Sequence, residues 1–229
     1  MAWIAAAAAA RSVMNVETFI APGFEENAYL VWATGSGTAV AIDPGGLAAD
    51  MLDQLADRGL TLEAVLLTHA HIDHIEGVAP IVRASGAPVY LHPDDEVLYR
   101  NAAVQAAQFG MRIEVPPPFD HRLSHGQVLE FAGVTFEVRH VPGHAPGHVL
   151  FHVPGAAAAF VGDVVFQGSI GRTDLPGGSY QQLMESIRQQ VLTLSDETTL
   201  YSGHGPATTV QRERTTNPFL APDFGGRFA

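Results

Sequence analysis

The chain of 229 residues contains no cysteine and no lysine, so all 12 of its basic residues are arginine. Without cysteine it has no disulfide, no thiol nucleophile and no thiolate metal ligand, which leaves nitrogen and oxygen as ligand atoms. Without lysine it can neither form a Schiff base nor use a lysine as a base. Thiol and lysine chemistry are therefore excluded.

Positive charge and long apolar stretches are also scarce. The formal net charge is −12 and the arginines form no basic run, so we expect no nucleic-acid partner. No apolar stretch reaches the ~18 residues that a membrane span requires, so we expect no membrane partner either. The alanine-rich residues 1–13 have no basic start and do not resemble a secretory signal. We predict that they form a disordered or helical extension of a cytoplasmic protein.

Residues 14–229 are predicted to form one domain, because 47% hydrophobic and 16% charged residues can bury a large core. Short apolar segments with strand propensity alternate with amphipathic segments, and Gly and Pro separate them. The predicted strands are residues 15–19, 26–33, 37–42, 64–68, 88–92, 127–131, 134–140, 148–153, 157–162 and 198–202. The predicted helices are residues 48–58, 75–84, 94–110 and 180–192. This order indicates an α/β fold, a four-layer αββα sandwich of two mixed β-sheets flanked by helices.

Three imidazoles and one carboxylate follow directly after the apolar residues 64–67. His69, His71, Asp73 and His74 form the pattern H-x-H-x-D-H at the end of a predicted strand. This pattern indicates a metal site, and more specifically a site for two metal ions. The alternative is a cluster of solvated loop histidines.

Three further residues of ligand type follow predicted strands. His144 lies in a short loop rich in Gly and Pro, Asp163 follows residues 157–162, and His204 follows the last strand. Loops at strand ends often carry a site on a rigid scaffold. We therefore expect all these residues at one edge of the sandwich.

Together these motifs resemble those of the metallo-β-lactamase superfamily, in which H-x-H-x-D-H is followed by a lone His, a lone Asp and a last His. The match runs from about Met14 to Phe219. The resemblance implies two metal ions, one held by His69, His71 and His144, the other by Asp73, His74 and His204, with Asp163 bridging both. It also implies a hydroxide shared by the metals as the nucleophile, with Asp73 catalytic as well as a ligand. Zinc is the expected metal, and iron or manganese also suit nitrogen and oxygen ligands.

Two stretches narrow the resemblance. Residues 168–178 resemble a loop of glyoxalase II-like hydrolases and of persulfide dioxygenases, and residues 202–206 resemble the short, single-domain glyoxalase II type. The resemblance implies hydrolysis of a glutathione thioester such as S-lactoylglutathione, whose thiol leaving group of pKa ~8.5 needs no strong general acid. Arg172 is the candidate for binding an anionic group of this small-molecule substrate. Its alternative role is that of a solvated arginine or a structural ion pair.

Three other functions remain open. One is a persulfide dioxygenase with one iron on His69 or His71, His144 and Asp163. Another is hydrolysis of lactones, β-lactams or phosphodiesters, although the acidic charge disfavours nucleases. The third, a non-catalytic partner-binding domain, is disfavoured because no ligand position has been lost.

Several other polar residues have plainer interpretations. Asp43 can either orient a ligand histidine or form a turn before Pro44. Thr68 can cap beside the first ligand, and His148 is expected to support the site by packing. The remaining histidines have no clustered partners in the sequence, and we expect ordinary strand or loop positions for His92, His121, His125, His140 and His152.

Overall fold

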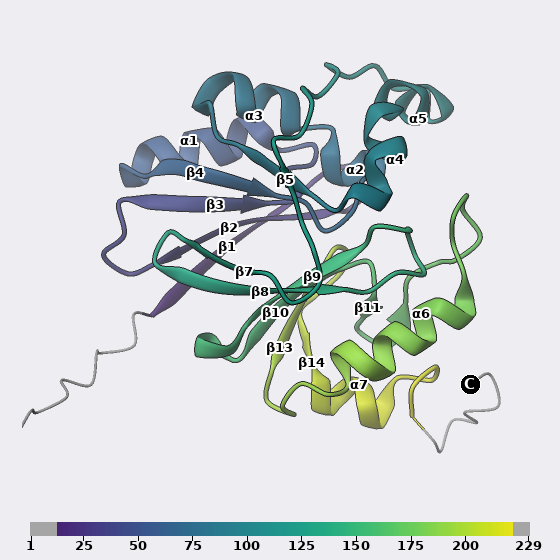
Figure 1. The fold of residues 1–229 in the computed structure, drawn as a ribbon. Helices are drawn as coiled ribbons and strands as arrows, with labels where there is room; N and C mark the ends of the chain where they lie inside the picture. Colours follow the sequence, from purple (N-terminus) through teal and green to yellow (C-terminus); the bar gives the residue numbers. More distant parts are fainter. Residues whose placement is uncertain (1–12, 222–229) are drawn as a thin grey trace, which may run out of the picture.

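Two six-stranded β-sheets lie face to face between outer helices in the computed structural model, which describes residues 13–221 (Figure 1). The four-layer sandwich predicted from the sequence is therefore confirmed. The predicted extension, residues 1–13, lies outside the described residues except for Val13. Within residues 13–221, no helix is long and apolar enough to cross a membrane.

The first sheet is mixed and has the strand order β1-β2-β3-β4-β5-β6. Its strands are β1 (Met14–Ile20), β2 (Asn27–Ala33), β3 (Thr38–Ile42), β4 (Thr61–Leu66), β5 (Val89–Leu91) and β6 (His121–Arg122). Strands β1 to β3 pair antiparallel, whereas β3 to β6 pair parallel. The helices of this half are α1 (Ala48–Arg58), α2 (Ile72–Ile75), α3 (Val78–Ser85), the 3₁₀ turn η1 (Pro93–Asp95), α4 (Glu96–Arg100) and α5 (Ala102–Gln108).

The second sheet, also mixed, has the order β14-β13-β10-β9-β8-β7. Its strands are β7 (Val128–Phe131), β8 (Val134–His140), β9 (Val149–Val153), β10 (Ala158–Gly162), β13 (Thr199–Ser202) and β14 (Thr208–Thr209). A small hairpin is formed by β11 (Val165–Phe166) and β12 (Ser169–Ile170). The helical segments of this half are η2 (Pro154–Ala156), α6 (Tyr180–Ser186), η3 (Ile187–Val191) and α7 (Val210–Thr216).

Three hydrophobic layers hold the sandwich together. One lies between the first sheet and its helices, the second between the two sheets, and the third between the second sheet and α6, η3 and α7. Phe136, Phe151 and Phe160 are fully buried in the middle layer. Each sheet therefore buries both of its faces over much of its width, which explains the apolar strand sequences.

Several predicted elements differ from the structure. The predicted helix of residues 75–84 is wrong as one element, because the helix begins at Ile72 and is interrupted at Gly77. There the chain packs so closely that a Cβ would clash with the carbonyl oxygens of Pro44 and Gly45. The predicted helix of residues 94–110 is divided at Asn101, and that of residues 180–192 ends in the π-type turn η3.

Other differences concern strands and the last helix. Strand β4 begins three residues earlier than predicted, since parallel pairing with β3 extends to Thr61. The two-residue strands β6, β11, β12 and β14 were too short to predict from an apolar pattern. Helix α7 was missed as well, although its N-terminal Thr209 accepts a hydrogen bond from the Arg212 N–H.

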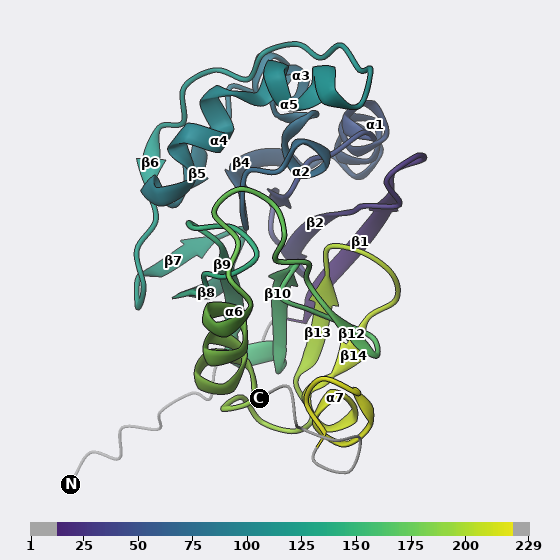
Figure 2. The same cartoon turned by 90° about the vertical axis from the view of Figure 1, so that its right-hand side faces the viewer.

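The strand directions place several loops at one edge of the sandwich. Strands β3, β4 and β5 are mutually parallel, and β8, β10 and β13 of the second sheet also run in one direction. Figure 2 looks onto this edge and shows α2 near the loops of the second half. The segments that follow these six strands therefore meet there.

We predict that the Phe160→Ala variant loses ~3–5 kcal/mol of unfolding free energy. Phe160 has no exposed surface, stacks on Tyr201 and contacts the Tyr29 ring edge-on, so its loss leaves a cavity between the sheets. Urea unfolding of the metal-free protein measures the effect. The control Val97→Ala, at a residue 71% exposed, should change stability by less than ~0.5 kcal/mol. Equal stability of the two variants would contradict this account of the middle layer.

Candidate metal centre

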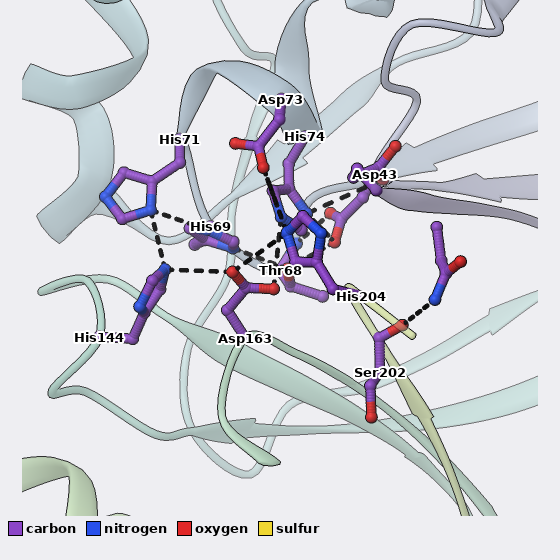
Figure 3. Close-up of polar contacts among 12 residues, drawn as sticks. Asp43, Thr68, His69, His71, Asp73, His74, His144, Asp163, Ser202 and His204 are labelled. Carbon is purple, nitrogen blue, oxygen red and sulfur yellow. Dashed lines mark hydrogen bonds and ion pairs between the residues drawn. The ribbon is translucent and has the colours of Figure 1, made fainter. Parts of the chain in front are cut away.

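The seven predicted ligands converge at the edge where the strand-end loops meet (Figure 3). They come from both halves of the fold. His69 and His71 follow β4, Asp73 and His74 lie on α2, His144 lies between β8 and β9, Asp163 follows β10, and His204 follows β13. The prediction that the H-x-H-x-D-H segment and the three later residues lie together is thus met by the geometry.

Three imidazole nitrogens form the first group. His71 Nδ1 lies 3.1 Å from His69 Nε2 and 2.8 Å from His144 Nε2. His69 has no exposed surface and His144 is 2% exposed. Three nitrogen atoms directed toward one another in a buried position could hold one divalent cation.

The second group consists of Asp73, His74 and His204. His204 Nε2 lies 3.2 Å from Asp73 Oδ2, and His74 Nε2 lies 3.7 Å from the same oxygen. His74 is fully buried, whereas the His204 side chain keeps 27% of its surface exposed and that of Asp73 15%. This group is therefore the more open of the two.

Asp163 lies between the two groups. Its Oδ1 is 3.4 Å from His74 Nε2, and its Oδ2 is 3.5 Å from both His144 Nε2 and His204 Nε2. One carboxylate thus faces ligand atoms of both groups, the arrangement that a bridging ligand requires.

The outward-facing nitrogen of four imidazoles is held by an acceptor. His144 Nδ1 donates to the Arg172 carbonyl at 2.8 Å, and His204 Nδ1 lies 3.1 Å from the Phe24 carbonyl. The other two acceptors are Asp43 Oδ2 for His74 and the Thr68 hydroxyl for His69. Such bonds fix the tautomer and direct the opposite nitrogen into the centre.

Asp43 takes the first of the two roles considered for it. Its Oδ1 accepts the Thr68 N–H at 2.7 Å, and its Oδ2 accepts the Thr68 hydroxyl at 2.6 Å and His74 Nδ1 at 3.0 Å. Because the Thr68 hydroxyl gives its proton to Asp43, it accepts from His69 Nδ1. One carboxylate therefore orients two of the imidazoles.

Sequence reasoning missed Glu26, which lies just before β2. Its side chain is fully buried, neither oxygen has a hydrogen-bond partner, and Oε1 is 3.9 Å from His74 Nδ1. Burial raises the pKa of Glu26 well above its usual value. A lone glutamate before a strand carries no signal of this position, because its neighbours come from the turn after β3 and from α2.

The electrostatics of the two groups differ. Burial lowers the pKa of His69 and His144 and brings that of His71 to about 4, so these imidazoles are neutral at neutral pH. Burial also lowers the pKa of His204, but its hydrogen bonds to Asp163 and Asp73 outweigh this effect and raise the pKa to about 10. The carboxylates of Asp73 and Asp163 therefore stabilise a positive charge in the second group.

These observations match the requirements of divalent cations. His74 Nε2 and Asp163 Oδ1 are buried without a hydrogen-bond partner, although both point into the centre. Buried polar atoms normally have partners, and neutral imidazoles with carboxylates are the donor set of divalent transition metals. The residues therefore fit one metal ion in each group.

Arg172 and His148 also lie beside the centre. The Arg172 guanidinium is exposed and forms two hydrogen bonds with Asp174, at 2.7 and 2.8 Å. His148 is fully buried, stacks on His69, and accepts the Asp163 N–H through Nε2 at 3.0 Å. His148 therefore supports the site, as expected.

Two of the remaining histidines, His92 and His140, occupy the expected loop and strand positions but have partners that the sequence does not show. The rings of His92 and His140 stack with centroids 4.1 Å apart and 9° between their planes, and Asp94 lies beside them. Because lone pairs of parallel imidazoles do not converge on one point, this group is a poor preformed metal site. His140 Nε2 instead lies 2.9 Å from the Pro146 carbonyl.

Known proteins resemble this chain over nearly its whole length. The hydroxyacylglutathione hydrolase GloC of Haemophilus influenzae is 37% identical over 209 residues, covering 90% of this chain and 98% of GloC. Among solved structures, the B3 metallo-β-lactamase BLEG-1 has a TM-score of 0.85 and 39% identity. The protein TTHA1623 in a di-iron-bound form has a TM-score of 0.82 and 44% identity. Each covers 90% of this chain and is itself fully covered.

The family described as the metallo-beta-lactamase superfamily matches residues 21–204, which contain every residue of the candidate centre. This range is well over half of the chain, and the fold and the strand-end donors agree with it. The chain belongs to the metallo-β-lactamase superfamily.

Proposed function

We propose that the protein is a hydroxyacylglutathione hydrolase, which cleaves a glutathione thioester such as S-lactoylglutathione. The observation that carries the proposal of a metal-dependent hydrolase is Asp163, whose two oxygens face both groups of donors. The narrower choice of substrate is supported by the similarity to GloC.

The residues that we propose to hold metal ions are the two groups of donors described above. His69, His71 and His144 would hold one ion, Asp73, His74 and His204 the other, and Asp163 both. Bound divalent ions would supply a hydroxide at neutral pH and polarise the substrate carbonyl. Zinc is our first choice, and iron is supported by the di-iron form of TTHA1623.

The protein's own groups would prepare the reaction in three ways. The buried His69 and His74 exclude water from one side of the centre. Asp43 and the Arg172 carbonyl hold the imidazoles of His74 and His144 in one orientation. Asp73, whose side chain keeps 15% of its surface exposed, would accept a proton from the attacking water. The leaving thiolate needs no strong acid, since a thiol has a pKa of ~8.5.

A second candidate is the hydrolysis of β-lactams. It is favoured by the similarity to BLEG-1, which is 39% identical to this chain, whereas GloC is 37% identical to it. The same donors would serve both reactions, because each begins with attack on a carbonyl carbon. The substrates therefore have to be compared directly.

We expect the purified full-length protein, stripped by a chelator and reloaded with Zn²⁺, Mn²⁺ or Fe²⁺, to hydrolyse S-lactoylglutathione only in the metal-loaded form. The measurement is the initial rate of thioester loss. Dissolved oxygen with glutathione persulfide, and a chromogenic cephalosporin, are followed in parallel. Iron-dependent oxygen uptake would instead identify a persulfide dioxygenase, and cephalosporin hydrolysis without thioester loss would identify a β-lactamase.

Substitution of Asp163, Asp73 or His204 by alanine should lower kcat by at least ~10³-fold, because each removal deletes a donor to the ions that polarise the carbonyl. Asp57→Ala and His121→Ala are the matched controls at exposed positions outside the centre. Circular dichroism should show that the variants fold, and metal content how many ions they lose. Wild-type turnover by Asp163→Ala would rule out the two-metal proposal.

Arg172 remains our proposed contact for an anionic group of the substrate. Arg172→Ala should raise KM for S-lactoylglutathione by about 10-fold with little change in kcat. Asp174→Asn should lower KM, since it frees the guanidinium. The hydrogen bonds from Arg172 hold the pKa of Asp174 at about 2, so the pair stays ionised and the Asp174→Asn effect should not vary between pH 6 and 9. If KM is unchanged in Arg172→Ala, Arg172 does not contact the substrate, and its role is the ion pair with Asp174.

A further inference from the structure

Asp95 is a buried carboxylate that bonds to two separate ligand loops. It ends the turn η1 after β5 and has no exposed surface. Its Oδ2 accepts the N–H of Ala70 at 3.0 Å, and its Oδ1 accepts the N–H of Gly147 at 2.6 Å. Ala70 lies between His69 and His71, whereas Gly147 belongs to the loop that carries His144.

The two loops belong to different halves of the fold. The His69–His71 segment continues from β4 of the first sheet, and the His144 loop continues from β8 of the second. A backbone bond from the Val149 N–H to the Thr68 carbonyl, 2.8 Å long, joins the bases of the loops. Asp95 joins them farther along, next to the imidazoles themselves.

The contact between Asp95 and the second loop requires a glycine. A Cβ at Gly147 would lie 2.6 Å from the Asp95 nitrogen and 2.9 Å from its Cγ, which is closer than real Cβ atoms come. The first loop is held twice, because Gln105 Nε2 donates to the Ala70 carbonyl at 2.9 Å. Both polar groups of Ala70 are therefore fixed by residues 95–105.

Keeping a carboxylate in this position is costly for the fold. Burial raises the pKa of Asp95 to about 6, although its two backbone hydrogen bonds act in the opposite direction. No basic side chain among the described residues forms an ion pair with it. Two charge-assisted hydrogen bonds from backbone N–H groups offset part of this cost of burial.

We propose that Asp95 is a positioning residue, which sets the separation of His144 from the His69–His71 pair and thereby the affinity of the three-imidazole site for its metal ion. The inference rests on the proposed metal centre. Removing such support typically weakens metal binding by about 10- to 100-fold. A residue that only stabilised the fold would leave the affinity of the folded protein unchanged.

The test is Asp95→Asn in the full-length protein, with Co²⁺ as the probe. Asparagine keeps the shape, but only one of its two terminal atoms can accept an N–H. We expect the dissociation constant of the Co²⁺ ion at the three-imidazole site, followed through its d–d absorption and measured by chelator competition, to rise about 10- to 100-fold, with a change in that absorption spectrum. The control Asp94→Asn removes the same charge next door, at a side chain 57% exposed that bonds to neither loop, and should match the wild type.

A second variant perturbs the same contact from the other side. Gly147→Ala leaves Asp95 intact but forces the loops apart, so it should change the Co²⁺ spectrum in the same way. The inference about Asp95 is overturned if folded Asp95→Asn or Gly147→Ala binds Co²⁺ with the affinity and spectrum of the wild type. This holds even if the metal-free variant melts at a lower temperature, and it leaves the proposed metal centre standing. A wild-type chain that binds no Co²⁺ would overturn the proposed centre as well.

Discussion

A buried carboxylate at the seam between the two halves of the fold is the constraint on which the rest of the centre depends. Asp163 is 7% exposed, and a buried charge is tolerated only when it is paired. Its oxygens face His74 from the first half and His144 and His204 from the second. The charge of Asp163 is therefore compensated by groups from both halves of the fold, His74 and His204. In this molecule the candidate metal centre therefore spans one edge of the junction between the sheets, whose interior is the middle hydrophobic layer.

Rigidity around that charge comes from side chains that never point into the centre. Asp43 ties His74 to the strand end that carries His69, and Asp95 bonds to the backbone beside two ligand loops. Each of these carboxylates accepts at least two hydrogen bonds from groups distant in sequence. Fixed imidazole orientations reduce the reorganisation that metal binding would otherwise require. The cost is a buried negative charge at each position, and the fold supports it with its three apolar layers.

Residues of the centre could be predicted from the sequence only where chemistry and chain position coincide. The H-x-H-x-D-H segment packs four donors into six residues after a strand, and parallel strands bring His144, Asp163 and His204 to the same edge. Glu26 and Asp95 could not be found in this way, because their partners are backbone or side-chain groups far along the chain. The break at Gly77 was missed for the same reason, since the carbonyls that exclude a side chain there belong to the turn after β3.

The donors cannot decide which substrate the centre serves. GloC and BLEG-1 carry different activities in their names, yet they are 37% and 39% identical to this chain. Selectivity must therefore arise where a substrate enters. His69 and His74 have no exposed surface, whereas Asp73 and His204 remain partly open. Phe166 packs edge-on against His204, and the Phe24 carbonyl lies 3.1 Å from Nδ1 of the same imidazole. The exposed side of the centre is therefore partly apolar, and it is there, rather than at the shared donors, that a thioester and a β-lactam would meet different surroundings.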